Sequence, residues 1–174
     1  MAFNRRSRYS PKAGNETVSR SALQSGIAAG TLAAGFAGLR AAYEGSTMFA
    51  PINAVTHCIW PRRAFSERGF SPRFTLSGFA IHQASAVFWA MLFEAVNARL
   101  ARGARRIDPV ATATAATATA ATAYIVDYHF MPERLRPGFE EHLSSRSLAG
   151  VYVALAAGFA AAALLRSRPQ GDRS

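Results

Sequence analysis

The chain has 174 residues, half of them apolar and 17% charged, with a formal net charge of +10 at pH 7. Soluble domains carry roughly 25% charged residues, and their helices mix apolar and polar positions at a period of about 3.6. Here the apolar residues gather in four blocks with the charges between them. The basic residues form no single stripe with aromatics, which argues against nucleic-acid binding. They flank the apolar blocks, which predicts a membrane protein in contact with lipids, including anionic headgroups.

Residue usage and charge placement predict which membrane this is and how the chain lies in it. The chain has 19 Arg against one Lys and is rich in Ala, a usage typical of GC-rich bacterial genomes. Arg and Lys are more frequent in the N-terminal tail, the loop 99–108 and the C-terminus than in the other connections. Such segments stay in the cytoplasm. We therefore predict a bacterial inner-membrane protein with both termini cytoplasmic.

The predicted fold is an all-α bundle of four transmembrane helices within residues 21–166. A basic tail, 1–20, is expected to be disordered, and a short cytoplasmic tail, 167–174, follows the bundle. Each apolar block is close to the roughly 20 residues that cross a bilayer. At the end of the first block, Leu39 or Arg40 would spoil a signal-peptidase site, which favours an uncleaved span. The four spans are predicted at about 22–43, 74–98, 109–131 and 148–165.

The third block, "ATATAATATAATAYIV", has the least clear pattern. Its alternation resembles that of a strand, but Ala is a poor strand former and a lone strand would leave its backbone unpaired in lipid. In a helix, each Thr returns its hydroxyl to a carbonyl one turn back. The segment therefore predicts a mildly hydrophobic helix that the other spans surround.

Residues 48–60 are too short to cross the bilayer. On a helix they separate into an apolar face with Met48, Phe49, Ile52, Val55, Ile59 and Trp60 and a polar face with Asn53, His57 and Cys58. This pattern predicts an interfacial helix in the headgroup plane, with Trp60 as its anchor. Because Pro51 and Pro61 bracket the segment, a re-entrant loop remains the alternative.

Two ridges of small residues predict how the spans pack, because small residues let helices approach closely in lipid. We expect the ridges to pack against each other, or else to join two copies of the chain. The first span carries Gly26, Gly30, Ala34 and Gly38, and the fourth carries Gly150, Ala154, Gly158 and Ala162.

The second span is two-sided. At about 100° per residue, His82, Ser85, Trp89 and Phe93 share one face, with Gln83, Glu94 and Asn97 beside it. The opposite arc is apolar, so we expect the polar side to face other helices or a wet cavity. Near the cytoplasmic end, we expect the Glu94 carboxylate to pair with Arg99 or another basic residue.

The topology also brings the end of the third span to the side where the second begins. This predicts an outer-side polar cluster of His82, Asp127, His129, His57, Arg40 and Glu44. Such a group could form structural hydrogen bonds, serve a proton or small-ligand pathway, or bind a metal or haem. No HxxxH or CxxCH spacing supports metal or haem, so we expect no cofactor. No GxSxG, HExxH or phosphate loop is present, so we expect no enzymatic activity.

The stretches "HQASAVFWAMLFE" and "VDYHFMPERLRPGFEEHLS" resemble uncharacterised multi-pass inner-membrane proteins of GC-rich proteobacteria. The resemblance implies a membrane location and adds no mechanism. We expect an accessory or structural protein that works with another membrane protein or with a second copy of itself. The competing hypothesis is a small transporter or proton-relay protein that uses His82 and Asp127.

Overall fold

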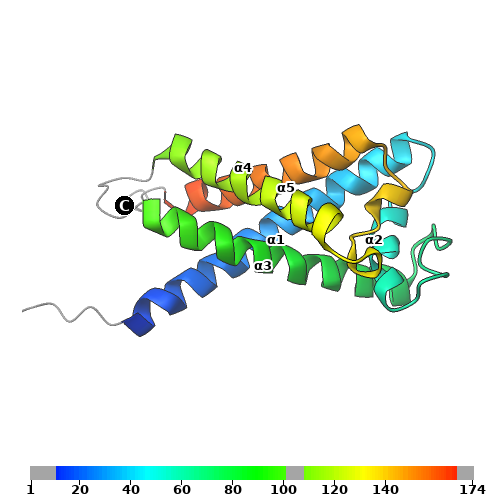
Figure 1. Cartoon of the computed structure of the whole chain (residues 1–174), viewed down its shortest axis with the longest axis horizontal. Helices are drawn as coiled ribbons and strands as arrows, with labels where there is room; N and C mark the ends of the chain where they lie inside the picture. Colours follow the sequence, from blue (N-terminus) through cyan, green and yellow to red (C-terminus); the bar gives the residue numbers. More distant parts are fainter. Residues whose placement is uncertain (1–10, 101–107, 168–174) are drawn as a thin grey trace, which may run out of the picture.

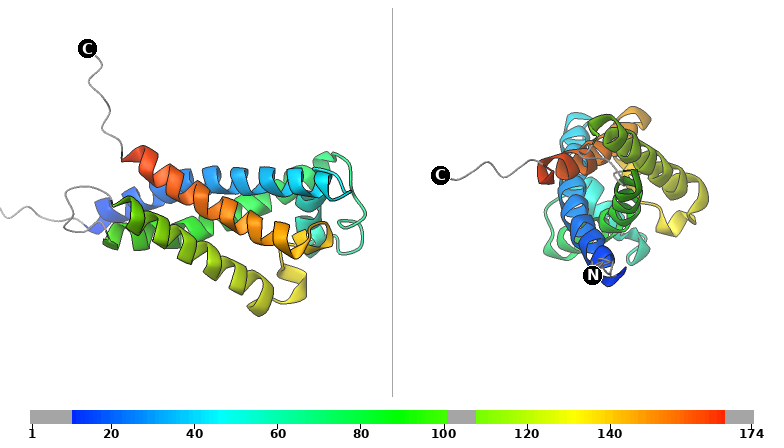
Figure 2. Two further views of the ribbon diagram at one scale, coloured as in Figure 1. Left: turned by 90° about the horizontal axis from the view of Figure 1, so that it is seen from above. Right: turned by 90° about the vertical axis from the view of Figure 1, so that its left-hand side faces the viewer.

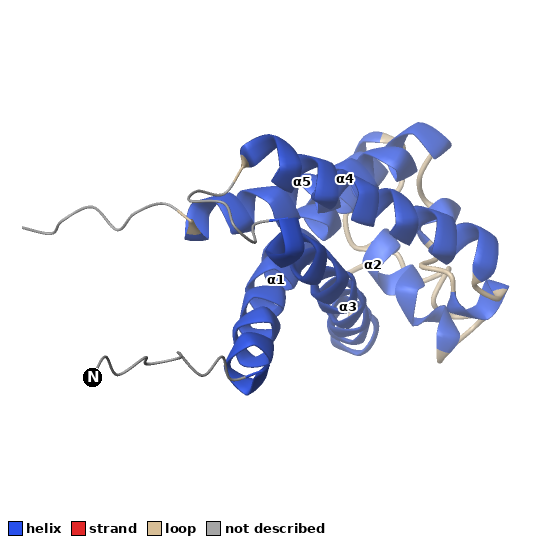
Figure 3. Cartoon of the chain, turned by 60° about the vertical axis from the view of Figure 1, so that its left-hand side comes forward, coloured by secondary structure: helices blue, strands red, loops and turns tan. Residues whose placement is uncertain are grey.

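The structure is a computed structural model that describes residues 11–100 and 108–167, and all regular elements in these two ranges are helical (Figure 3). Four long helices alternate in direction and form the bundle (Figure 1). Figure 2 shows α5 between α1 and α4. The all-α class is therefore confirmed. The long helices are α1 (Pro11–Tyr43), α3 (Ser77–Leu100), α4 (Pro109–Ile125) and α5 (Ser145–Arg166).

Three helical segments are long and apolar enough to cross a membrane: Val18–Tyr43, Pro72–Leu100 and Ser145–Arg166. They correspond to the first, second and fourth predicted spans. The third predicted span forms α4, which has 17 residues and so is shorter than the roughly 20 that a span needs. A π-helical turn, Val126–Phe130, continues it.

The N-terminal boundary differs from the prediction. Helix α1 begins at Pro11, so the described part of the predicted disordered tail is helical. Residues 12–21 contain no proline that would end the helix. Residues 1–10 and 168–174, and most of the loop 99–108, lie outside the described residues.

The predicted interfacial helix is instead buried in the bundle end. It consists of α2 (Ala50–Ala54) and a 3-10 turn (Val55–Cys58), and residues 50–57 are all buried. Its polar face has protein partners: Asn53 Nδ2 donates to the carbonyls of Glu67 and Gly69 at 2.9 and 2.8 Å. Protein carbonyls therefore accept the hydrogen bonds of this polar face, for which the sequence pattern predicted contact with the headgroup plane.

The predicted ridge pairing is wrong in detail, although α1 and α5 do pack together. A Cβ atom on Gly26 would lie 2.5 Å from Val87 Cα, and one on Gly30 would meet Gln83, so the ridge of α1 faces α3. The ridge of α5 does face α1, but on a different side of that helix. Cβ atoms on Gly150 and Gly158 would meet Phe36 and Ala29, and one on Gly38 would meet the Met48 carbonyl. Helix α1 therefore uses two faces, one for each neighbour.

The end of the bundle that holds the start of α1 is fastened by a partly buried ion pair. The Arg166 guanidinium at the end of α5 pairs with the Glu94 carboxylate of α3. Ser25 of α1 donates to Glu94 at 2.5 Å and accepts from Arg166 at 2.8 Å. The predicted pairing of Glu94 with a basic residue is thus present, with Arg166 as the partner. One cluster ties three helices together.

Candidate functional site

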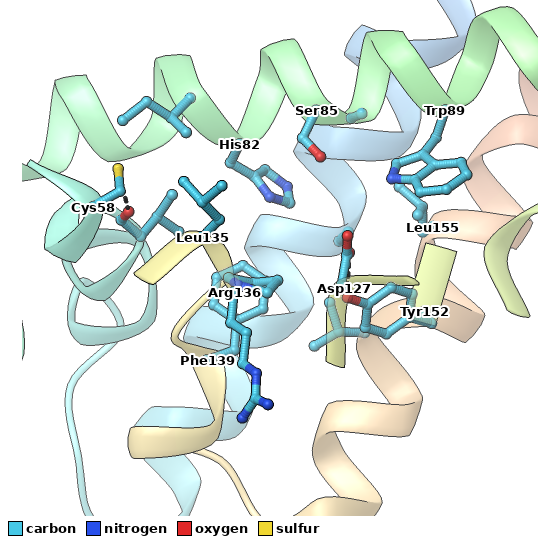
Figure 4. A pocket seen from close by; sticks show the side chains of 16 residues that line it. Cys58, His82, Ser85, Trp89, Asp127, Leu135, Arg136, Phe139, Tyr152 and Leu155 are labelled. Atoms are coloured by element: carbon cyan, nitrogen blue, oxygen red, sulfur yellow. Dashed lines mark hydrogen bonds between the residues drawn. The ribbon is translucent and has the colours of Figure 1, made fainter. Parts of the chain in front are cut away.

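The polar side of α3 faces a cavity of about 150 Å³ between α1, α3, α5 and the connection 131–139 (Figure 4). The cavity lies toward the end of the bundle that holds α2. Most of its wall is aliphatic or aromatic, and a few polar groups point into it. The polar groups on its wall belong to Cys58, His82, Ser85, Trp89, Asp127, Arg136 and Tyr152.

The His82 ring is oriented by the backbone of α1. Its Nε2 lies 2.9 Å from the Gly30 carbonyl oxygen. Since a carbonyl only accepts, Nε2 carries a proton, and in the neutral ring Nδ1 is the atom that can accept. Phe139 lies beside the ring, with the two ring centroids 5.6 Å apart. The site therefore presents a fixed imidazole with one acceptor nitrogen.

Asp127 reaches the same cavity from the π-helical turn Val126–Phe130. A π turn changes the direction of side chains relative to the preceding helix, and such turns are frequent at functional sites. The Tyr152 hydroxyl of α5 donates to Asp127 Oδ2 at 2.7 Å. In the part of the chain that the structure describes, no cation lies within ion-pair distance of this carboxylate. An imidazole and a carboxylate from different helices thus share one cavity.

The structure places the other predicted cluster residues elsewhere. The His57 ring lies against Phe65, and its two nitrogens face the carbonyls of Ala54 and Glu133 at 2.9 and 3.1 Å. Only a doubly protonated ring could donate both bonds. His129 is exposed beside Tyr124. The topology brought all these residues to one end of the bundle, but their side chains leave the backbone in different directions.

The predicted anchor Trp60 packs against protein side chains. Its ring makes an edge contact with Phe74, and the Arg73 guanidinium lies 4.4 Å from its centroid. The arrangement combines an aromatic pair with a cation–π contact. These two contacts join the segment after α2 to the turn Pro72–Leu76, which leads into α3.

Arg40 and Glu44 form a second polar group, which holds the start of α5 to the end of α1. Arg40 Nη2 pairs with Glu44 Oε1 at 2.9 Å, and Arg40 Nε donates to Ser147 Oγ at 2.8 Å. Glu44 also accepts from the Ser144 N–H at 2.7 Å and from the Ser147 hydroxyl. A carboxylate at a helix N-terminus is favourable because the free N–H groups point toward it. This group is structural and separate from the cavity.

We expect Glu44 to make stability depend on pH in the acid range. The hydrogen bonds from the Ser147 hydroxyl and the Ser144 N–H lower the pKa of Glu44 from 4.5 to about 2. A lowered pKa stabilises the fold above pH 4.5, and this contribution is lost as the pH falls toward 2. Glu44→Gln should therefore lower the thermal midpoint of the detergent-solubilised protein above pH 4.5, and the deficit should shrink below it. A deficit that stays the same below pH 4.5 would contradict this role of the carboxylate.

Sequence reasoning missed part of the cavity. Tyr152 lies on a span that was expected to be purely structural, yet it holds Asp127. The available signal in the sequence was a single tyrosine hydroxyl in an otherwise apolar, alanine-rich span. Trp89 and Ser85 were placed on the polar face of α3 but not assigned to a site. Arg136, which no sequence pattern singled out, also lines the cavity.

Within the described ranges, no group of three or more His, Cys, Asp or Glu side chains is close enough to hold a metal ion. The geometry instead offers an imidazole (His82), a carboxylate (Asp127), two hydroxyls (Ser85 and Tyr152) and an indole (Trp89) around a small, mostly apolar space. No family model, curated protein sequence or solved structure matches this chain. Its function therefore has to be argued from the cavity.

Proposed function

We propose that the protein is an integral membrane protein that binds a small molecule in this cavity, as a small transporter or proton-relay protein would. The observation that carries the proposal is that His82 and Asp127, from different helices, line one cavity whose walls are otherwise mostly apolar. Ligand sites combine apolar walls with a few convergent polar groups. Ionisable residues at membrane depth are costly and mark pathways or ligand sites.

The polar groups of the cavity retain capacity for a ligand. His82 uses Nε2 on Gly30, and Asp127 uses Oδ2 on Tyr152. In the described residues, His82 Nδ1 and the second oxygen of Asp127 have no hydrogen-bond partner. A dry cavity of about 150 Å³ is known to accept a benzene-sized molecule, so the space suits a small ring or a short branched group.

The cavity has a side opening. Ser85 and Leu135, which line it, are exposed, Leu135 by 60%. We infer that a ligand reaches the cavity through this opening and not along the bundle axis.

The proposed membrane arrangement has four spans in the bacterial inner membrane, with α4 and its π-helical turn as the third. Its support is the alternating direction of the four helices and the excess of Arg at the end where the chain begins. We expect a cytoplasmic reporter to be active when fused to either terminus and inactive when inserted after Glu67. Activity at that loop, or at only one terminus, would contradict the arrangement.

The ligand hypothesis is tested with three ring-sized probes: toluene, benzyl alcohol and benzylamine. We expect ligand-observed NMR on the purified full chain to detect binding of at least one of them. His82→Ala should weaken that binding at least 10-fold, because it removes an acceptor and part of the wall. His129→Ala is the matched control and should bind like the wild type. If none of the probes binds, the proposal is wrong.

A second candidate, an accessory subunit, is supported by one surface. The side of α4 that faces away from α5 exposes small side chains along a shallow groove that includes Val110, Ala113 and Thr117. Small residues let a second transmembrane helix approach closely. Under this function, Thr117→Leu would abolish co-purification of a membrane partner and leave probe binding unchanged. Under the first, the cavity variants would be the damaging ones.

A further inference from the structure

We infer that the ligand of this cavity is a cation, an alkylammonium with a small apolar body, and that it exchanges with a proton on the Asp127 carboxylate. The inference rests on the proposed ligand-binding function and names the ligand class. It follows from the charge balance and the shape of the cavity.

Asp127 has no cationic partner among the described residues. Among the cavity-lining residues, Arg136 is the only permanent cation, and its guanidinium points away from Asp127 and His82 (Figure 4). The His82 ring donates its Nε2 proton to a carbonyl, and the Tyr152 hydroxyl is a neutral donor. An ionised carboxylate in such surroundings needs either a proton or a positively charged partner. The cavity thus selects for positive charge.

Aromatic rings form part of the cavity wall near Asp127. Trp89 and Phe139, which are 7% and 2% exposed, form part of the wall, and the Tyr152 ring lies beside Asp127. Aromatic faces attract ammonium groups, and Trp is the strongest of them. Alkyl substituents on the nitrogen would contact the apolar wall. A carboxylate together with aromatic rings suits an organic ammonium better than a hydrated metal ion.

The free nitrogen of His82 favours a protonated amine over a quaternary ammonium. His82 Nδ1 is an acceptor that faces no protein donor within the described ranges. A primary or secondary ammonium could donate one N–H to Asp127 and another to His82, whereas a quaternary ammonium has no N–H. We therefore expect benzylamine to bind more tightly than benzyltrimethylammonium.

Proton exchange gives the binding a definite pH dependence. The titratable or charged groups around Asp127 are Cys58 from the 3-10 turn, His82 from α3, Tyr152 from α5, Tyr128 on its own turn, and Arg136 and Glu140 from the connection. Helix α1 contributes Ala33 to the cavity wall and the Gly30 carbonyl to His82, and neither is titratable. Protonation of Asp127 removes negative charge, and protonation of His82 adds positive charge. Both changes weaken the binding of a cation, so its affinity should fall as the pH is lowered.

The experiment compares benzylamine with its neutral isostere, benzyl alcohol, by calorimetry on the purified full chain. We expect benzylamine to bind at least 10-fold more tightly, with an affinity that falls at lower pH, while the alcohol shows less pH dependence. In Asp127→Asn the preference for benzylamine over benzyl alcohol should be lost, and an unchanged circular dichroism spectrum would show that the variant is folded. His129→Ala should keep the wild-type preference.

Each outcome bears on a different part of the hypothesis. If benzyl alcohol binds as tightly as benzylamine, the charge inference is wrong and the proposed ligand-binding function stands. If no probe binds, the proposed function itself is wrong. If Asp127→Asn does not fold, the wild-type pH series decides: an affinity for benzylamine that does not change with pH would overturn the exchange with a proton.

Discussion

Arg166→Ala is expected to lower the free energy of unfolding by about 1–3 kcal/mol, because it leaves the nearly buried Glu94 carboxylate without its cationic partner. The Glu94 side chain is only 8% exposed, and the Arg166 side chain is its cationic partner. Ser25 would remain as a donor, but a hydroxyl does not balance the charge. Unfolding in mixed detergent micelles, followed by circular dichroism, measures the loss.

The control is the double variant Glu94→Leu with Arg166→Leu, which removes both charges. Replacement of a buried ion pair by apolar residues is often neutral or stabilising. We therefore expect the double variant to recover most of the stability that Arg166→Ala loses. If the double variant is as unstable as the sum of its single variants, the two side chains are not coupled. The assignment of this pair as the fastening of α3 to α5 would then be wrong.

Gly158→Ala is expected to destabilise the bundle by about 1–3 kcal/mol, the range for overpacking a close contact. A Cβ atom at this position would lie 2.4 Å from Ala29 Cα. The atom it meets belongs to the backbone of α1, so no side-chain rotation could relieve the overlap and the two helices would have to separate. The same unfolding assay measures the effect.

Gly35→Ala is the matched control, because a Cβ atom there would meet nothing within 4 Å. Ala is favoured over Gly inside a helix by up to about 1 kcal/mol. The two identical substitutions should therefore change stability in opposite directions. Equal effects at both positions would mean that α1 and α5 do not approach each other at Gly158.

The sequence was most informative about the helices themselves. Blocks of apolar residues predicted the helical class, and three of the four predicted spans correspond to helices that are long and apolar enough to cross a membrane. The two-sided pattern of α3 correctly predicted that His82 and Glu94 face protein. These predictions depend only on local periodicity and composition, which a single sequence contains.

What the sequence could not predict was which face meets which neighbour. Spacing identifies Gly26 and Gly30 as a close-packing ridge, but α3 and α5 both offer small residues, so the choice between them depends on the whole bundle. The segment 48–60 had an amphipathic pattern, yet Asn53 found its partners in the loop that follows. A polar face looks the same in sequence whether water or backbone carbonyls satisfy it.

The candidate site shows the same limit. The topology correctly placed His82 and Asp127 toward one end of the bundle, but a one-residue change in helical phase decides whether a side chain points inward. The π-helical turn alters this phase after Ile125, and it turns Asp127 toward Tyr152 while His129 remains exposed. No local pattern of residues in the sequence predicted this π-helical turn.

The contacts between α1 and α5 have a consequence for biosynthesis. The first long helix, α1, leaves the ribosome early, but the groups that hold it in place arrive with the last helix, α5. Ser144 and Ser147 donate hydrogen bonds to Glu44, and Arg166 donates one to Ser25. In the proposed membrane arrangement, the face of α1 that carries Ala29 and Phe36 stays uncovered until translation reaches α5. A polypeptide cut short before α5 would thus present unfinished contacts to the proteases that survey the membrane.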